Sequence, residues 1–135
     1  MMLRGAVAIV AGASGAIGTA TCRALGAQGA HVVFASLDDS MLRELVDVAL
    51  VEQISHLAVP TNLRSRDDID RLIAKTLEAF GRIDILVNAA GIGSSPAMCD
   101  STDAEIEGVV TVNLLGPARL MHAVLPTMKA QRCGS

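Results

Sequence analysis

The sequence predicts an α/β fold in which helices cover both faces of a parallel sheet of about four strands. Short apolar runs alternate with helical patterns along all 135 residues. The first apolar run, residues 6–10, passes directly into a glycine-spaced loop and then into a helical pattern. Right-handed crossovers between such units favour the strand order 3-2-1-4. No repeat or linker interrupts the chain, so we expect one three-layer domain over residues 1–135.

The strands and the first two helices follow from local signals. β-branched and apolar runs predict strands at residues 6–10, 31–36, 54–59 and 83–88. Gly29 should end the first helix, and Asp38, Asp39 or Ser40 should cap the second. The expected core faces are Ile17, Thr21, Ala24 and Leu25 in the first helix and Leu42, Leu45, Val46 and Ala49 in the second.

The last two helices have clear start signals. Residues 65–68 (S-x-x-D) and 102–105 (T-x-x-E) match capping boxes. Gly81 should end the third helix, and Pro117 should kink the fourth near Gly116. The expected core faces are Ile69, Leu72, Ile73, Thr76, Leu77 and Phe80 in the third helix and Ile106, Val109, Val110, Leu114, Leu120, Val124 and Met128 in the fourth.

Composition narrows the class of partner. The chain is 51% hydrophobic with only two aromatic residues, Phe34 and Phe80, so aliphatic side chains must build the core. A net charge of −3 without a basic block argues against nucleic acid and anionic membrane surfaces. No uninterrupted apolar run reaches the roughly 18 residues of a membrane span. Three widely spaced cysteines and three histidines without metal-ligand spacing predict no disulfide framework, no metal site and a cytoplasmic location.

The glycine-spaced loop is the first candidate site. Gly12 would form the tight turn, Gly15 or Ala16 would let a pyrophosphate approach the backbone, and Gly18 would let the helix pack closely on the strand. A helix N-terminus behind such a loop favours a phosphate. An ordinary turn between a strand and a helix, without a ligand, is the alternative interpretation.

The end of the second strand is the second candidate. In dinucleotide folds an acidic residue at this place binds the ribose hydroxyls, and a nearby Arg binds a 2′-phosphate. Here Ser36 ends the strand, and Asp38 follows two residues later. Asp38 and Asp39 equally suit the role of helix caps. Ser36 leaves room for a 2′-phosphate but has no adjacent Arg, so neither NAD nor NADP is selected.

Three further groups follow the other strands. Asn62 comes after the third strand, where a polar side chain could meet an adenine edge or simply lie in a solvated turn. The small residues 88–91 (NAAG) follow the fourth strand, at the expected switch point of the sheet. Asn113 falls among apolar residues of the long helix, where we expect it to be buried and either to lock the helix to the sheet or to organise a water.

Four motifs in this order resemble the short-chain dehydrogenase/reductase family: AGASGAIG at 11–18, NLRSRDD at 62–68, GRIDILVNAAG at 81–91 and VNLLGPARLMHAVLPTM at 112–128. The resemblance spans Leu3 to Ser135. It implies a Rossmann-type fold that binds NAD or NADP. It also implies an oxidoreductase that moves a hydride between nicotinamide and a carbonyl or alcohol carbon of a small substrate.

The resemblance also implies roles for particular residues. Asn113 matches the Asn of the family's catalytic tetrad, Asn62 faces the adenine, and Asn88 borders the nicotinamide side. The cofactor-binding residues expected from the loops and the resemblance together are Gly12, Ser14, Gly15, Ala16, Ile17, Gly18, Ser36, Asn62, Leu63, Asn88, Ala89, Ala90 and Gly91.

The sequence departs from the family pattern at several places. Ala11 replaces the usual Thr, Ala16 the commoner Gly, and Asn62 the commoner Asp. The family continues into a fifth strand with the catalytic Ser and then a Tyr-x-x-x-Lys helix. The sequence contains no Tyr, and neither Lys75 nor Lys129 stands in that motif. The resemblance therefore implies an incomplete, truncated member that binds cofactor but lacks the Ser, Tyr and Lys.

Two other interpretations stay open: a non-catalytic nucleotide-binding or interaction protein, and a marginally folded fragment. Without a further strand, strand four is expected to be an open edge and the long helix to lack a neighbour. Open edges and apolar faces recruit partners. We therefore expect a homo-oligomer, formed by edge pairing or by packing of the helices at residues 103–130.

Overall fold

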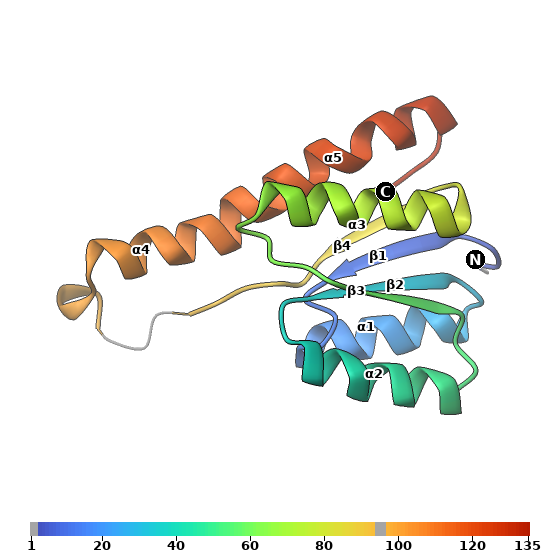
Figure 1. The fold of residues 1–135 in the computed structure, drawn as a ribbon, viewed down its shortest axis with the longest axis horizontal. Coiled ribbons are helices and arrows are strands. Elements are labelled where there is room, and N and C mark those ends of the chain that lie inside the picture. The colour runs from blue at the N-terminus through green and yellow to red at the C-terminus, as the bar shows by residue number, and fades with distance from the viewer. Residues whose placement is uncertain (1–2, 94–96) are drawn as a thin grey trace.

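The computed structural model describes residues 3–93 and 97–135, and its architecture is the predicted one (Figure 1). All strand pairs are parallel, and the sheet order is β3-β2-β1-β4, as predicted. The elements in chain order are β1 (Val7–Ala11), α1 (Ala16–Ala27), β2 (His31–Ser36), α2 (Asp39–Val51), β3 (His56–Pro60), α3 (Arg66–Phe80), β4 (Ile85–Asn88), the 3₁₀ turn η1 (Met98–Asp100), α4 (Asp103–Val110), the π-turn η2 (Thr111–Leu115) and α5 (Gly116–Gln131).

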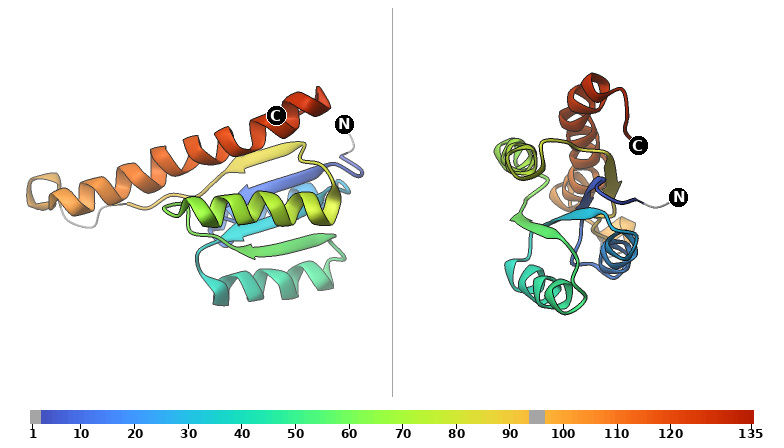
Figure 2. Two further views of the ribbon diagram at one scale, coloured as in Figure 1. Left: turned by 45° about the horizontal axis from the view of Figure 1, so that its top comes forward. Right: turned by 90° about the vertical axis from the view of Figure 1, so that its right-hand side faces the viewer.

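The helices form two layers, one on each side of the sheet. Helices α1 and α2 cover one face, and α3 and α5 cover the other (Figures 1 and 2). Side chains of β1 alternate between these layers, as the pleat of a strand requires. Ile9 packs with α3 and α5, whereas the next residue, Val10, packs with α1 and α2.

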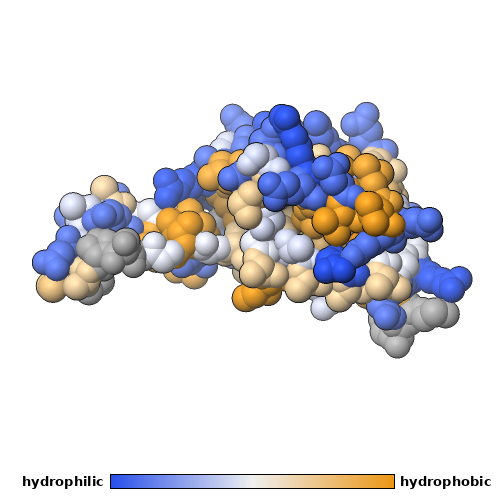
Figure 3. Space-filling view, turned by 90° about the horizontal axis from the view of Figure 1, so that it is seen from below, coloured by the Kyte–Doolittle hydropathy of each residue, from blue (hydrophilic) through white to orange (hydrophobic). Residues whose placement is uncertain are grey.

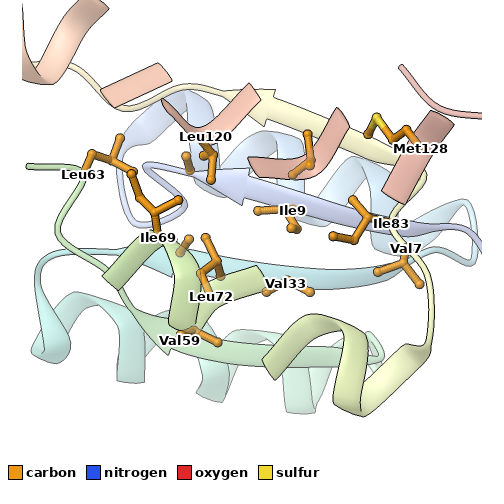
Figure 4. Close-up of a cluster of buried hydrophobic side chains, with 13 residues drawn as sticks. Val7, Ile9, Val33, Val59, Leu63, Ile69, Leu72, Ile83, Leu120 and Met128 are labelled. Carbon is orange, nitrogen blue, oxygen red and sulfur yellow. The ribbon is translucent and has the colours of Figure 1, made fainter. Parts of the chain in front are cut away.

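Both cores are built almost entirely from aliphatic side chains, as the composition predicted. On one face Ile69 and Leu72 of α3 and Leu120 of α5 are fully buried against β1 (Figure 4). On the other face Phe34 lies with Cys22 of α1 among leucines of α2. Burial raises the pKa of the Cys22 thiol to about 12, so this cysteine is an inert core residue.

The predicted starts of β3 and β4 were each two residues early, because a helix end and a side chain take the backbone groups there. Ile83 lies before β4, and its N–H and C=O both pair with the side-chain amide of Gln131, at 3.1 and 2.9 Å. Ile54 lies before β3, and its N–H donates to Ala49 O at the end of α2. The first strand also runs one residue later than predicted, since Ala11 pairs with Ala35 and Asn88.

The predicted face of α1 was wrong in part, because Leu25 packs against the core as predicted but Ile17 does not. Gly18 and Cys22 are the buried residues of this helix, whereas Ile17 is 75% exposed. In α2 the prediction was confirmed for Leu42, Leu45 and Ala49, which are all buried.

The two predicted capping boxes have different outcomes. At α4 the box is complete: the Thr102 hydroxyl accepts from Glu105 N–H, and the Glu105 carboxylate accepts from Thr102 N–H. At α3 only half of the box forms. Ser65 Oγ accepts from Asp68 N–H at 3.2 Å, but the Asp68 carboxylate accepts from Asn62 N–H instead of Ser65 N–H.

The long last helix runs without interruption from Asp103 to Gln131 and contains a π-turn where a kink was predicted. Gly116 N–H donates to Thr111 O, five residues back, and Pro117 lies in the first turn of α5. Only the C-terminal half packs on the sheet, through Leu120, Val124 and Met128. The predicted burial was wrong for Val110 and Leu114, which are 49% and 67% exposed. The helix therefore extends beyond the body of the molecule (Figure 2).

The outer edge of β4 is partly paired. Ser135 N–H donates to Asp84 O, and Leu86 N–H donates to Ser135 O, both at 2.9 Å. This is the bond pattern of a parallel neighbour. Among the described strands, β4 is an edge strand, as predicted.

By length and composition alone, the helix Asp103–Gln131 would suffice to cross a membrane. The sequence-based search for an uninterrupted apolar run missed it, because isolated charges such as Arg119 break the run. The criterion is weak, since a core helix passes it too, and Leu120 and Val124 pack as core residues do. The absence of a membrane partner therefore stays a prediction.

Candidate functional site

A groove of about 400 Å³ opens at the carboxyl ends of the four strands. Each strand contributes to it through the loop that follows. In open α/β sheets this edge is where ligands bind. The lining residues are Gly12, Ser14, Gly15, Ala35, Ser36, Leu37, Met41, Thr61, Asn62, Leu63, Arg64, Ala89, Ala90, Gly91, Ile92 and Val112.

Two glycines allow the backbone to pack closely around the loop after β1. Gly12 has φ +78°, and a Cβ there would stand 2.5 Å from Ala90 N, so the loops after β1 and β4 touch backbone to backbone. Gly18 is in the first turns of α1, and a Cβ there would stand 2.0 Å from Gly12 O. The helix can therefore approach the loop this closely only because residue 18 has no side chain.

The N-terminus of α1 differs from those of α2, α3 and α4. Asp38, Ser65 and Thr102 cap these three helices through their side chains, and acidic residues lie in each first turn. The residue before α1 is Gly15, which provides no side-chain cap, and the first turn of the helix has no acidic residue. Its first N–H groups and its dipole are therefore available to an anion in the groove.

At the end of β2, two hydroxyls meet across the groove. Ser14 Oγ and Ser36 Oγ are 2.5 Å apart, and Ser36 is only 7% exposed. Asp38 does not line the groove. Its Oδ1 accepts from Met41 N–H at 2.9 Å and from Ser40 Oγ at 2.8 Å, and these bonds hold the pKa of its carboxyl below the ordinary value. Of the two interpretations of Asp38, the helix cap is the one that the structure confirms.

At the end of β3, Asn62 lies in an ordered turn. Its Oδ1 accepts from Arg64 N–H at 3.0 Å, and its own N–H donates to Asp68 Oδ2 at 2.8 Å. The bond from Asn62 N–H, followed by the charge of Arg71, lowers the pKa of Asp68. The Asn62 Nδ2 group makes no hydrogen bond within the described ranges, so it is free to meet a ligand.

Asn113, in the long helix, is hydrogen-bonded to the loop that follows β4. Its Oδ1 accepts from Ile92 N–H and its Nδ2 donates to Ile92 O, both at 2.9 Å. The prediction that Asn113 is buried was wrong: the residue is exposed, in the middle of the π-turn. Its two bonds attach the helix to the loop after β4 and not to the sheet itself, as one predicted alternative had it. Gly91 and Ile92 of that loop line the groove.

Replacing Asn113 by alanine should release this loop. Two hydrogen bonds are lost, and at a site open to solvent we expect a loss of about 1 kcal/mol of stability. The amide of Ile92 should exchange with solvent faster in hydrogen-exchange measurements. Leu114→Ala, on the next exposed residue, is the matched control and should leave the exchange of Ile92 unchanged. Equal protection of Ile92 in both variants would contradict this assignment.

The structure brings most predicted residues to one groove. Nine of the thirteen lie in its lining: Gly12, Ser14, Gly15, Ser36, Asn62, Leu63, Ala89, Ala90 and Gly91. Four do not line it: Ala16, Ile17, Gly18 and Asn88. Residues 94–96, which follow this small-residue segment in the sequence, lie outside the described residues. Sequence reasoning gave no role to the other seven lining residues. They are Ala35, Leu37, Met41, Thr61, Arg64, Ile92 and Val112. Arg64 and Val112 lie within the motifs that carry the resemblance, but their residue types gave no signal of their own.

A comparison of the sequence with protein-family models identifies the family. The model of short chain dehydrogenases matches residues 6–135. The chain belongs to the short-chain dehydrogenase family. The match covers every strand and helix of the described fold, including the turn Thr111–Leu115 that carries Asn113.

Individual relatives of this short-chain dehydrogenase agree with that assignment. An uncharacterized oxidoreductase of Staphylococcus haemolyticus is 37% identical over 132 residues, covering 98% of this chain and 56% of that protein. The 3-oxoacyl-[acyl-carrier-protein] reductase FabG of Thermotoga maritima is 34% identical over 137 residues, covering 100% of this chain and 55% of that protein. The chain therefore spans about half the length of the curated relatives it matches.

A solved structure shows the same fold. The crystal structure of a metagenomic short-chain oxidoreductase in complex with NADP matches with a TM-score of 0.92 and 35% identity. The match covers 99% of this chain and 61% of that one.

Proposed function

We propose that residues 1–135 form the cofactor-binding part of an NAD(P)-dependent oxidoreductase and bind the dinucleotide in the groove at the carboxyl ends of the strands. The observation that carries this proposal is the uncapped N-terminus of α1 behind a loop whose Gly12 has φ +78°. A pyrophosphate there would accept hydrogen bonds from backbone N–H groups that no side chain takes.

The other loops fit the remaining parts of a dinucleotide. Asn62 has a free amide donor for an adenine edge, with apolar surface beside it from Leu63 and Leu37. The small residues Ala90 and Gly91 leave room for a flat ring near the end of β4. The crystal structure of a relative in complex with NADP supports a dinucleotide as the ligand.

The reaction class follows from the family. Bound nicotinamide supplies hydride transfer, and this chain's residues hold the cofactor and exclude water from it. We propose a small carbonyl or alcohol substrate and a cytoplasmic location, which suits the three free cysteines. Within these 135 residues no Tyr is present to donate a proton, and a positioned acid or base supplies roughly 10²–10⁴ in rate. We therefore expect binding without turnover from this chain alone.

Titration with each cofactor tests the proposal. NAD⁺ and NADP⁺ are added in separate calorimetric titrations, and the melting temperature is followed in parallel. Saturable binding of at least one of them, with a rise in melting temperature, is the expected result. Hydride transfer is then followed by the absorbance of the reduced nicotinamide with a panel of small ketones. A protein that melts cooperatively but binds neither dinucleotide would refute the proposal.

A second function, self-association, is favoured by the exposed side of the long helix. Val110 and Leu114 before the end of the π-turn, and Met121 and Leu125 after it, are apolar residues that are 46 to 67% exposed. Apolar surface is visible on the body and along the extension that carries the helix (Figure 3). Exposed apolar side chains in this number along one helix favour a protein partner.

The distribution of charged residues along the long helix favours a second copy of the chain as that partner. Asp103 and Glu107 lie near the start of the helix, and Lys129 and Arg132 lie at its end. No Asp or Glu follows residue 107, and no Lys or Arg lies between residues 83 and 118. Two antiparallel copies therefore pair acidic with basic ends through a two-fold axis.

Sedimentation velocity at several concentrations should detect this pairing. We expect a dimer for the unaltered chain and a monomer for Leu114→Glu, because the new carboxylate would be buried without a partner. Val51→Glu, at an exposed apolar residue at the end of α2, is the matched control and should leave the dimer intact. A wild-type chain that stays monomeric at every concentration would exclude the interface.

A further inference from the structure

The turn after β3, residues 61–64, forms one wall of the groove, because every residue in it is a lining residue. In the register of the sheet Ser36, the last residue of β2, lies beside Pro60. The turn therefore begins next to the end of β2, where dinucleotide folds bind a ribose. A base attached to that ribose reaches the turn after β3.

Two charged side chains of α3 hold this turn in place. Asp68 Oδ2 accepts from Asn62 N–H at 2.8 Å, and Arg71 Nη2 donates to Pro60 O at 3.1 Å. The two side chains also pair with each other, since Arg71 Nη2 lies 3.1 Å from Asp68 Oδ1. This Asp68–Arg71 bridge connects the end of β3 to the turn, and neither of its side chains lines the groove.

From these contacts we infer that Asp68 and Arg71 are positioning residues for the dinucleotide, which fix the turn after β3 in the shape that receives the base. The inference rests on the proposed dinucleotide function. It goes beyond that function because it assigns part of the affinity for the adenosine half to two side chains outside the groove.

The bonding of Asp68 differs from ordinary helix capping. In a capping box its carboxylate would accept from Ser65 N–H. Here Ser65 N–H donates to Asn62 O at 2.9 Å, and the carboxylate accepts from Asn62 N–H. Asn62 Oδ1 in turn accepts from Arg64 N–H at 3.0 Å. Asn62 is therefore held at its backbone N–H, its backbone C=O and its side chain before a ligand arrives.

A wall that is ordered in advance raises the affinity for a ligand, because binding does not have to order it. The bond from Asn62 N–H to the Asp68 carboxylate is charge-assisted and therefore stronger than a bond between neutral groups. The side chain of Asp68 is 23% exposed and that of Arg71 is 46% exposed. Solvent weakens the contribution of the more exposed partner, so we expect Asp68 to matter more than Arg71.

A role in starting α3 alone makes a different prediction. Any acid in the first turn of a helix stabilises the helix through its dipole. Asp67 lies in the same first turn as Asp68 and makes no hydrogen bond or ion pair within the described ranges. It has the charge of Asp68 without the bond to the turn, so it separates helix stability from positioning.

Titration of the full chain with a dinucleotide and with each of its halves tests the inference. Calorimetry follows whichever of NAD⁺ and NADP⁺ binds more tightly, and NMR titration follows 5′-AMP and nicotinamide mononucleotide at millimolar concentration. Asp68→Ala should weaken the dinucleotide and 5′-AMP about three- to tenfold and leave the mononucleotide within about twofold. Asp68→Asn keeps an oxygen for Asn62 N–H and should recover most of the loss.

Asp67→Ala is the matched control and should leave all these affinities within about twofold. Arg71→Met keeps the apolar stem and should cost less than Asp68→Ala. The double variant should lose less than the sum of the two single losses, because both side chains act on one turn. In hydrogen-exchange measurements the amide of Asn62 should exchange faster in Asp68→Ala and not in Asp67→Ala.

The outcomes separate the two proposals, and the melting temperature of each variant shows whether it folds. If a folded chain binds neither dinucleotide, the proposed function fails and the inference fails with it. If Asp68→Ala binds the dinucleotide as tightly as the unaltered chain, the inference is overturned while the proposed function stands. An equal loss for both halves, or an equal loss in Asp67→Ala, would also overturn the inference. If Asp68→Ala does not fold, Arg71→Met decides by the same comparison of the two halves.

Discussion

Replacing Gly18 by alanine should lower the free energy of unfolding by about 3 kcal/mol, the upper end of the usual cost of overpacking. A Cβ at this position would stand 2.0 Å from Gly12 O and 2.9 Å from Ala13 Cα. Both are backbone atoms, so no change of rotamer relieves the overlap. The helix must move away from the loop, and the N–H groups at the start of α1 move with it. Urea denaturation measures the loss of stability, and cofactor titration should show a fall in affinity of at least about tenfold.

Gly15→Ala is the matched control for this prediction. Gly15 has φ −73°, which any residue adopts, and a Cβ there would meet only Gly12 O at 3.4 Å. Its stability should therefore stay within about 0.5 kcal/mol of the unaltered chain. If both alanine variants unfold at the same urea concentration as the original chain, the close approach of α1 to the loop does not exist in solution.

The contrast between these glycines shows where sequence reasoning succeeds. The order of strand, glycine loop and helix predicted the groove and its backbone-lined wall, because each is a local pattern. The strand order followed from handedness and connection rules that need no side-chain detail. The buried aliphatic residues of α2, Leu42 and Leu45, followed from helical periodicity.

Helical periodicity predicted the wrong buried residues where a glycine makes the contact or where the helix is not a regular α-helix. In α1 the closest approach is made by Gly18, which packs against the loop after β1 and which no hydrophobic pattern counts, whereas Ile17 is exposed. In the last helix the π-turn at Thr111–Leu115 adds a residue to one turn, so the faces on its two sides are out of register. The burial predicted for Asn113 and Leu114 assumed an unbroken α-helix.

Contacts between residues far apart in the sequence could not be predicted, for a different reason. Ser14 and Ser36 are 22 positions apart, and their 2.5 Å contact exists only once β1 and β2 pair. The competition for Asp68 is similar: the capping-box pattern offered Ser65 as its partner, and the turn after β3 brought Asn62 N–H closer. A local sequence pattern indicates possible hydrogen-bond partners, but which of them pair depends on the tertiary structure.

Asp84 is a residue that the sequence patterns placed inside a strand and gave no role. Its carboxylate is 7% exposed and accepts from Val7 N–H at 2.8 Å and from both Nε and Nη2 of Arg82 at 2.8 and 2.7 Å. It therefore satisfies the first N–H of β1 and joins β1 to the segment that enters β4. The bonds from Arg82, and to a smaller extent that from Val7, lower its pKa below the ordinary value, although burial opposes the shift.

Replacing Asp84 by alanine should cost about 2–3 kcal/mol of stability. Val7 is 1% exposed, so its N–H would be left buried without an acceptor. Arg82 is about half exposed and can turn to solvent, which limits its share of the loss. Asp84→Asn keeps an oxygen for Val7 N–H and removes only the charge, so it should cost about 1 kcal/mol at neutral pH. Urea denaturation at pH 7 should rank the three proteins in this order.

The pH dependence separates the charge of Asp84 from its hydrogen bond. Because the folded pKa lies below the unfolded value of about 3.9, the carboxylate contributes its full stability above that pH and loses it as the pH falls through the folded pKa. The unaltered chain should therefore lose stability more steeply than Asp84→Asn below about pH 5. Asp38, Asp68 and Glu105 also have lowered pKa values, but they are present in both proteins, so the difference between the two curves belongs to Asp84. Parallel curves down to pH 2 would mean that Asp84 joins the strands through its oxygen alone.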